Sequence, residues 1–160
     1  MLQFDKNGHL VPFESHQITL DEFQQVFVES FPESETRQPL FDNYLDWIFD
    51  FQRDISPDFT QWVNGSFVTQ KLNPKDIDFV TFVEGSVFES KQNEMDRFWS
   101  FSNEDKGLDA YLLAEFEEGH PDFLEFVRFK SVWVKRYSNG SKNDNLRTIQ
   151  KGFIQIIFQK

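Results

Sequence analysis

The feature that most limits the fold is a pair of aspartates at the start of a strongly apolar stretch. Residues 77–83 read I-D-F-V-T-F-V, and β-branched and aromatic residues of this kind favour a buried strand, here over 76–83. Because side chains alternate across a strand, Asp76 and Asp78 share one face. Two adjacent carboxylates repel each other unless a cation lies between them. The alternative is an exposed strand end whose aspartates are solvated.

The length and aromatic content predict one domain with a rigid core. The chain has 160 residues, of which 18% are aromatic and 21 are phenylalanine, so it can bury a substantial aromatic core. No linker long enough to separate two domains is present. We divide the single domain into an N-terminal hairpin and helices (1–55), a catalytic core (59–115) and a basic helix, loop and closing strand (120–160).

The absence of certain residues and segments excludes several classes of protein. There is no cysteine, so disulfides, thiolate metal sites and cysteine nucleophiles are excluded. The N-terminal residues M-L-Q-F-D-K-N-G-H lack an apolar signal-peptide core, and no stretch approaches 18 apolar residues. We therefore expect a cytoplasmic protein with no membrane partner.

Charge is distributed unevenly along the chain. Residues 1–126 carry 8 Lys/Arg and 26 Asp/Glu, a net charge of −18, whereas residues 127–160 carry 8 Lys/Arg and only Asp144, a net charge of +7; together they give the overall −11. A basic segment beside an acidic body could bind a phosphate-bearing ligand or pair with the body itself. A solvated amphipathic helix and loop is the alternative.

Start and stop signals predict two helices in the first third of the chain. Thr19 and Glu22 form a capping box, which opens a helix that ends at Pro32. A second helix is expected from Ser34 to about Asp54, with its aromatic residues in the core.

The remaining pattern predicts an α+β (α/β-like) fold. Asn7-Gly8 indicates a turn between two short extended pieces. Strands are expected at 59–64, 76–83, 109–115 and 152–158, and helices at 86–101 and from about Pro121 to Tyr137, with a polar loop at 138–145. The last helix is predicted to turn five residues inward: Phe123, Phe126, Val127, Val132 and Trp133. We expect a small, mixed, twisted sheet with helices packed mainly on one face.

The residues between the first two of these strands could bind a phosphate. Gly65 has no Cβ, so a phosphate can approach its backbone closely, and Ser66 offers a hydroxyl and an N–H where a short helix would begin. Nine intervening residues separate Ser66 from Asp76. Asp109 begins a third strand and would lie beside Asp78 if that strand pairs with 76–83. Three carboxylates around Mg²⁺, facing Gly65-Ser66, outline a two-metal phosphoryl or nucleotidyl transfer site.

These motifs resemble a known superfamily. Gly65-Ser66 followed by Asp76-Ile77-Asp78 is similar to the signature of the polymerase-β-like nucleotidyltransferases, and Leu108-Asp109-Ala110 is similar to their third carboxylate motif. The whole chain also resembles an uncharacterised family of small bacterial nucleotidyltransferase-like proteins. This second resemblance rests on the core G-S-F-V-T-x-K-x-x-P-x-D-I-D, the early T-L-D-E-F, and Lys151-Gly152 before the last strand.

The resemblance implies a nucleotidyltransferase fold and a role for each matching residue. Gly65 and Ser66 would hold the β- and γ-phosphates of a nucleoside triphosphate such as ATP. Asp76, Asp78 and Asp109 would bind Mg²⁺ or Mn²⁺, with Asp109 also helping to deprotonate the acceptor.

Several basic residues are weaker candidates for ligand binding. Lys71 is included among the phosphate-binding residues; for Lys71 and Lys75 a plain surface position is the alternative. Five further basic residues could bind an acceptor or the triphosphate tail: Arg128, Lys135, Arg136, Arg147 and Lys151.

Other chemistries find little support in the residues. His9, His16 and His120 are isolated and lack the spacing of zinc ligands. No histidine is placed by sequence to activate Ser66, and the chain has neither a Walker-A loop nor a G-x-G-x-x-G turn.

Two hypotheses of function follow. The first is a Mg²⁺-dependent nucleotidyltransferase that moves a nucleoside monophosphate from an NTP to a protein or RNA acceptor, with no DNA involved. The resemblance makes a toxin–antitoxin or phage-defence setting plausible, with a cognate toxin or antitoxin as partner. The second is a catalytically weak or silent module on the same fold, either an acidic antitoxin or regulatory partner or a nucleotide sensor.

Overall fold

The structure is a computed structural model that describes residues 2–142 and 148–160. Its strands are β1 (Gln3–Phe4), β2 (Leu10–Val11), β3 (Ser15–Gln17), β4 (Phe59–Asn64), β5 (Ile77–Glu84), β6 (Leu108–Glu115), β7 (Asn139–Lys142), β8 (Thr148–Gln150) and β9 (Phe153–Phe158). Its α-helices are α1 (Leu20–Gln24), α2 (Arg37–Asp54), α3 (Gly85–Ser90), α4 (Gln92–Met95) and α5 (Phe123–Ser138). A π-helical turn, η1 (Gln25–Glu29), and three 3₁₀ turns, η2 (Asp96–Phe98), η3 (Ser100–Ser102) and η4 (Glu104–Lys106), complete the described elements.

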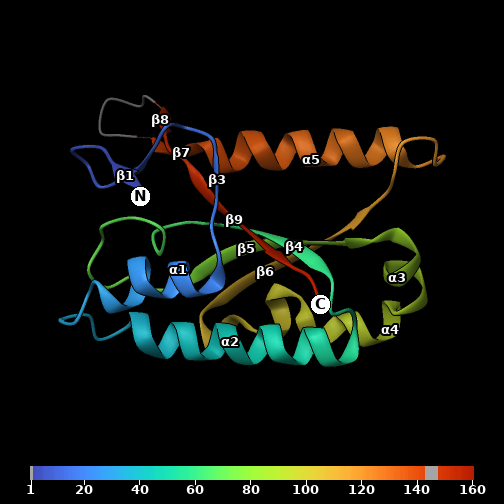
Figure 1. Cartoon of the computed structure of the whole chain (residues 1–160), viewed down its shortest axis with the longest axis horizontal. Helices are drawn as coiled ribbons and strands as arrows, with labels where there is room; N and C mark the ends of the chain where they lie inside the picture. Colours follow the sequence, from blue (N-terminus) through green and yellow to red (C-terminus); the bar gives the residue numbers. More distant parts are fainter. Residues whose placement is uncertain (1, 143–147) are drawn as a thin grey trace.

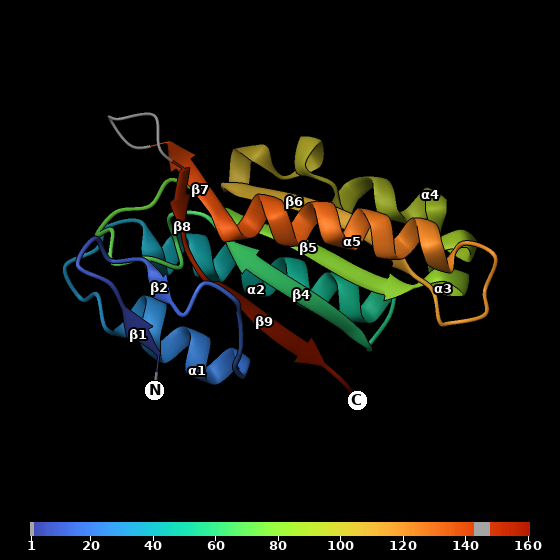
Figure 2. The same ribbon diagram turned by 90° about the horizontal axis from the view of Figure 1, so that it is seen from above.

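The main sheet has five strands in the order β3-β9-β4-β5-β6. β4 runs antiparallel to β5 and β9, whereas β6 is parallel to β5 and β3 is parallel to β9. Figure 2 shows the strands β4, β5 and β9 twisted relative to one another, with α5 lying over the sheet. The fold is therefore a mixed α+β fold, as predicted. β4, β5, β6 and β9 each match a predicted strand to within one residue, and β3 was not predicted.

Helices cover both faces of the sheet because its central strands are apolar on both faces. Residues 79–83 of β5 are all buried, and successive side chains point to opposite faces, so neither face can be left to solvent. Figure 1 shows α1 and α2 on one side of the sheet and α5 on the other. Our expectation that helices pack mainly on one face holds for α1 to α4 and is wrong for α5.

The face covered by α2 is an aromatic core that contains a short chain of hydrogen-bonded side chains. Trp47 stacks on Phe51 with ring centroids 4.8 Å apart. Tyr44 donates a hydrogen bond to Oε1 of Gln61 at 2.6 Å, and Nε2 of Gln61 donates one to Thr81 at 2.9 Å. The aromatic content predicted such a core.

Capping chemistry explains the first helices. The predicted capping box is confirmed: Thr19 Oγ1 accepts from the N–H of Glu22 at 3.1 Å, and the N–H of Thr19 donates to Glu22 Oε2 at 2.9 Å. The helix continues beyond α1 as η1. α2 begins at Arg37 rather than at Ser34, because the Ser34 hydroxyl caps it from outside by accepting from the N–H of Arg37 at 3.1 Å.

The helix predicted over 86–101 is wrong in detail. The segment is instead four short pieces, α3, α4, η2 and η3. Lys91 has φ −114° and ψ 17°, and Trp99 is extended with φ −76° and ψ 160°. Each leaves the helical region and ends a piece. Met95 and Phe98 of this segment are buried in the core.

Two corrections concern the C-terminal segment. Phe126 and Tyr137 are buried under α5, but Val127 and Val132 are 41% and 59% exposed, so their predicted inward position is wrong. The large aromatic residues fix which side of α5 meets the sheet. Part of the predicted polar loop forms β7, which pairs with β8; residues 143–145 of that prediction lie outside the described part of the chain.

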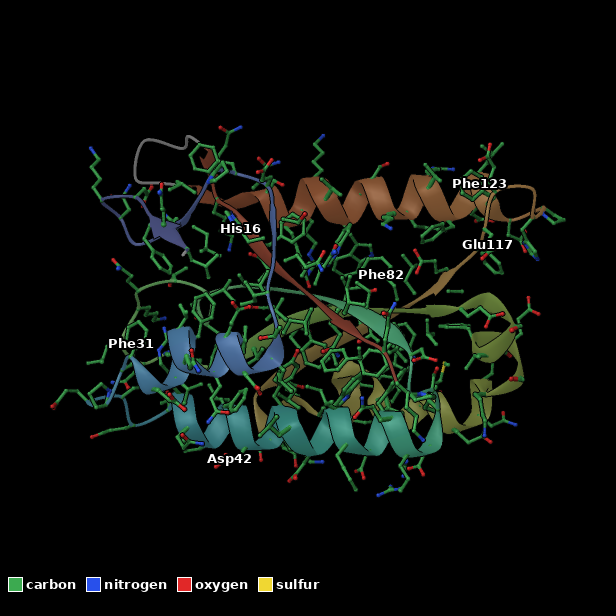
Figure 3. The ribbon with its side chains drawn as sticks, in the orientation of Figure 1. His16, Phe31, Asp42, Phe82, Glu117 and Phe123 are labelled. Atoms are coloured by element: carbon green, nitrogen blue, oxygen red, sulfur yellow. The ribbon has the colours of Figure 1, made fainter. Side chains whose placement is uncertain are left out.

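The face covered by α5 holds a second, smaller aromatic cluster. It contains Trp62, Val80, Phe82, Phe126, Tyr137 and Phe153. Figure 3 shows Phe82 in the layer between the sheet and α5, and Asp42 on the outer side of α2. Among the helices described, none has both the length and the apolar character needed to cross a bilayer.

The N-terminal hairpin is confirmed and rests against the β4–β5 connection. β1 and β2 pair antiparallel around Asn7-Gly8, and Gly8 has φ 79°. The N–H of Gln70 donates to the carbonyl oxygen of Gly8 at 3.0 Å. The hairpin tip and the residues after β4 thus form two walls of one surface region.

Candidate functional site

A polar row crosses three strands at one end of the sheet. Asn64 on β4 is the register partner of Asp78 on β5, and Asp78 is the register partner of Asp109 on β6. Trp62, two residues before Asn64, and Val80, two residues after Asp78, lie in the cluster beneath α5. Because alternate side chains share a face, Asn64, Asp78 and Asp109 also point to the α5 side. The predicted pairing that would bring Asp109 beside Asp78 is confirmed.

Burial and neighbouring charges shift the pKa of Asp78. Burial raises the pKa of Asp78 to about 7; the charges of Asp76 and then Asp109 and a hydrogen bond shared with Asp109 add to the rise, and the charge of Lys151 opposes it. Asp76 itself lies just before β5 rather than within it. Burial and the neighbouring charges of Asp76 and Asp109 thus disfavour the ionised form of Asp78 near neutral pH.

Gly65 is required by its backbone and by its neighbour. Its φ is 76°, a left-handed conformation that favours glycine. A Cβ at this position would overlap the carboxylate of Asp78. The predicted reason for this glycine was close approach of a phosphate; the structure adds that the Asp78 side chain itself leans over the Gly65 backbone.

Ser66 begins a turn, not a helix. The Thr69 hydroxyl donates to the carbonyl oxygen of Ser66 at 2.7 Å, and the Thr69 N–H donates to the same oxygen at 3.3 Å. The described elements include no helix between β4 and β5; of the short helical turn or loop that the sequence allowed after Ser66, the structure forms a turn. The Thr69 side chain competes for the bonds a helix would use.

Arg37 holds this loop in place, and sequence reasoning missed it. Its side chain is fully buried. Nη1 donates to the carbonyls of Phe27 at 2.6 Å and Phe67 at 2.7 Å, and Nη2 donates to those of Thr69 at 2.8 Å and Lys71 at 2.6 Å. Burial lowers the pKa of Arg37 to about 10, so the guanidinium stays charged at neutral pH. Arginine inside an amphipathic helix pattern gives no sequence signal for such a role.

A cavity of about 720 Å³ opens in front of the loop. Asp76 and Asp78 line it, together with Gly65 and Ser66. The hairpin tip forms the facing wall, including Lys6 and His9, and Lys71 and Lys151 add further positive charge. Carboxylates at the base and ammonium groups around them suit a ligand that carries both phosphates and a cation.

Lys151 is the predicted basic residue that the structure brings closest to the carboxylates. Burial lowers its pKa, and the charge of Asp78 partly opposes that change. Its N–H donates to the carbonyl oxygen of Ser138 at 3.0 Å, which fixes it between α5 and β9. Lys151 is therefore placed to meet an anion bound beside Asp78.

The other predicted basic residues lie elsewhere. Lys75 is exposed before β5, and Arg128 and Lys135 are exposed on α5. Arg136 lies 5.1 Å from the ring centroid of Tyr111 and stacks on the α5 surface. Arg147 is outside the described residues.

Asp109 is held by a hydroxyl from the turn η3. The hydroxyl of Ser100 on η3 donates to Asp109 Oδ1 at 2.7 Å. This hydroxyl orients the Asp109 carboxylate. Ser100 was not predicted as a site residue because the break in the helix at Trp99, which places Ser100 beside Asp109, was not recognised.

The donor set suits a divalent cation, but it is not gathered into a finished centre. Carboxylate oxygens are preferred ligands of Mg²⁺, and a cation would relieve the repulsion along the row. Within residues 2–142 and 148–160, no group of three or more His, Cys, Asp or Glu side chains is already arranged around one position. Asp78 and Asp109 form the contacting pair, and Asp76 acts on Asp78 through its charge.

Comparison with known proteins places the chain in a family. A family model described as a family of unknown function (DUF6932) matches residues 2–157. The chain belongs to this family. No curated protein and no solved structure matches it. The chemistry of the row must therefore carry the functional argument.

Proposed function

We propose that the protein is a Mg²⁺-dependent nucleotidyltransferase built on the polymerase-β-like nucleotidyltransferase fold. One observation carries the proposal: Asp78 and Asp109 are register partners on adjacent parallel strands, and Asp78 lies against the backbone of Gly65 at the wall of a cavity of about 720 Å³. Repelling carboxylates are expensive to keep in a fold unless they bind something.

Each residue has a stated task in this proposal. Oxygens of Asp76, Asp78 and Asp109 would hold Mg²⁺ or Mn²⁺, which when bound supplies positive charge to the attacking and leaving oxygens. Gly65 and Ser66 present backbone and hydroxyl to the phosphates of ATP or another NTP. Lys151 and Lys71 neutralise phosphate charge from the rim of the cavity.

The transfer step is a substitution at phosphorus. A hydroxyl of a protein or RNA acceptor attacks the α-phosphorus, and the bond from that phosphorus to the oxygen bridging to the β-phosphate breaks. Pyrophosphate leaves, and the hydroxyl proton passes to Asp109, which Ser100 holds in position. The acceptor keeps the nucleoside monophosphate. A cognate toxin or antitoxin, or a phage-defence partner, would fit as acceptor.

Labelled nucleotides test the proposal. The protein is incubated with Mg²⁺ and α-³²P-labelled NTPs in the presence of total RNA or of soluble host protein, and pyrophosphate release and label transfer are measured. Asp78→Asn and Asp109→Asn should abolish both signals. Asp42→Asn, the same substitution at an exposed site on α2, should leave them unchanged. Transfer that survives Asp78→Asn, or its absence from the wild type with every acceptor, would contradict the enzyme.

A second candidate is a nucleotide sensor or regulatory partner without turnover. Two observations favour it: the row lacks a finished three-ligand group among the described residues, and the overall charge of −11 suits a basic partner. Equilibrium binding of Mg²⁺–ATP without pyrophosphate release would support the sensor. Unchanged neutralisation of a basic partner by an Asp76→Asn/Asp78→Asn variant would support the regulatory partner.

A further inference from the structure

Two buried polar atoms beside the carboxylates lack hydrogen-bond partners. Oδ1 of Asn64 and the hydroxyl of Tyr137 are inaccessible to solvent and unpaired within the described structure. The two side chains belong to residues that are 6% and 3% exposed. Buried polar groups in folded proteins are nearly always satisfied, because an unmet donor or acceptor costs about 1–3 kcal/mol. Both atoms therefore require an explanation.

Both atoms lie at the same place in the fold. Asn64 is the register partner of Asp78 and points to the α5 side. Tyr137, near the end of α5, packs against Phe153, and the charges of Asp78 and Asp109 help burial to raise the pKa of its hydroxyl. One unmet acceptor and one unmet hydroxyl thus border the row from β4 and from α5.

A buried amide on the same strand, the one of Gln61, is satisfied on the other face of the sheet. Gln61, three residues before Asn64, accepts from Tyr44 and donates to Thr81. The same strand therefore carries one fully bonded amide and one amide whose oxygen has no partner. The difference is position: Gln61 faces the α2 core, whereas Asn64 faces the carboxylates.

We propose that the amide oxygen of Asn64 is an additional ligand of the cation held by Asp78 and Asp109, and that the Tyr137 hydroxyl positions those carboxylates around it. This inference rests on the proposed function. An amide oxygen suits a hard cation, and as a neutral group it completes the ligand set without adding a further negative charge to a row that already repels itself. Tyr137 acts as a positioning residue by donating its hydroxyl proton to a carboxylate oxygen.

Binding of Mn²⁺ tests the inference without any measurement of activity. Free Mn²⁺ is followed by electron paramagnetic resonance during titration of the full chain, with isothermal titration calorimetry as a second readout. Asn64→Ala should weaken Mn²⁺ binding about tenfold. Asn64→Asp should restore or exceed wild-type affinity, because it returns an oxygen ligand. Tyr137→Phe should weaken binding a few-fold and leave the secondary structure unchanged.

Controls separate this inference from the proposed function. Asn43→Ala removes another asparagine, one that donates to the Lys106 carbonyl at 2.9 Å, and should leave Mn²⁺ affinity unchanged. If the wild type binds Mn²⁺ and Asp78→Asn abolishes binding, but Asn64→Ala binds as tightly as wild type, the inference is wrong and the proposed function stands. If the wild type does not bind Mn²⁺, both are wrong. Circular dichroism of each variant shows whether it folds, and recovery in Asn64→Asp excludes a merely structural loss.

Discussion

Arg37 and Asp78 both place a charge away from solvent beside the loop between β4 and β5, and the chain treats the two charges in opposite ways. Arg37 is fully buried and donates to four backbone carbonyls from two segments. Asp78 is partly buried and shares its surroundings with the like charges of Asp76 and Asp109. One side chain stabilises the loop, and the other is itself destabilised by its neighbours.

A buried ion is tolerated when it is hydrogen-bonded or paired. Arg37 donates from both Nη atoms to four backbone carbonyls, although its Nε has no partner, and so organises the loop that carries Gly65 and Ser66. Asp78 instead has like charges beside it in the chain alone. Perturbed carboxylates in a cavity are typical of binding sites, so we expect the chain to respond in opposite ways to removal of the two charges.

The largest expected effect comes from removing the guanidinium of Arg37. Arg37→Met leaves the carbonyls of Phe67, Thr69 and Lys71 without their donor, and we expect the free energy of unfolding to fall by about 3–5 kcal/mol. Urea denaturation at pH 7 measures it. Arg37→Lys keeps the charge but cannot match the planar fork, and it should recover part of the loss. A loss below about 1 kcal/mol for Arg37→Met would contradict the assigned role.

Removing the carboxylate of Asp78 is expected to change the free energy of unfolding in the opposite direction. Because the folded pKa of Asp78 is raised to about 7 from the ordinary value of 3.8, the folded chain binds a proton more tightly than the unfolded chain. Stability from this group is present below about pH 4 and is lost as pH rises through 7. In EDTA, Asp78→Asn should therefore match wild type near pH 4 and exceed it by about 2 kcal/mol at pH 8.

Mg²⁺ sharpens the same comparison. Added Mg²⁺ should raise the melting temperature of the wild type at pH 8 and leave that of Asp78→Asn unchanged, because ligand binding stabilises the folded state alone. Asp42→Asn serves as the matched control and should show neither the pH-dependent gain nor a loss of the Mg²⁺ response. Equal stability of wild type and Asp78→Asn across the pH range would mean that the row is not strained.

A loss similar in size to the Asp78→Asn gain is expected at Gly65, where the two regions meet. Gly65→Ala forces a side chain into a positive-φ conformation and into the Asp78 carboxylate, and should lower the free energy of unfolding by about 2 kcal/mol. In an Asp78→Ala background the overlap is gone, and the same change should cost about 1 kcal/mol. Urea denaturation of the four chains gives the coupling. Equal costs in both backgrounds would show that Asp78 does not lean over Gly65.

Much of the fold, and part of the arrangement of the site, could be predicted from sequence. The apolar run after Asp76 identified β5, and the expectation that Asp109 lies beside Asp78 if its strand pairs with 76–83 is confirmed by the register. These predictions succeed because strand periodicity is local and strong. The same run also implied that both faces of the sheet are covered, which we did not infer when we expected helices mainly on one face.

What could not be predicted depends on contacts between distant segments. Arg37 lies 30 residues from Phe67, and nothing in its helix indicates that its partners are carbonyls of a later loop. Asn64 reads as an ordinary strand end until register sets it beside Asp78. The exposed side of α5 depends on which aromatic residues reach the sheet, and spacing alone placed Val127 on the wrong side. Roles for the site residues remain predictions that the experiments above test.

The smallest expected effect concerns Asp109, the member of the row that has a hydroxyl donor. Ser100→Ala removes the 2.7 Å hydrogen bond to Asp109 Oδ1 and should lower the free energy of unfolding by about 1 kcal/mol. A double-mutant cycle with Asp109→Ala should return a coupling of similar size. Ser102→Ala is the matched control, since Ser102 donates to the Asp96 carbonyl at 2.9 Å and should show no coupling to Asp109. A coupling for Ser100 below about 0.3 kcal/mol would mean that the Ser100 hydroxyl does not stabilise Asp109. Asp109 would then resemble Asp78, and only a bound ligand could stabilise the two carboxylates.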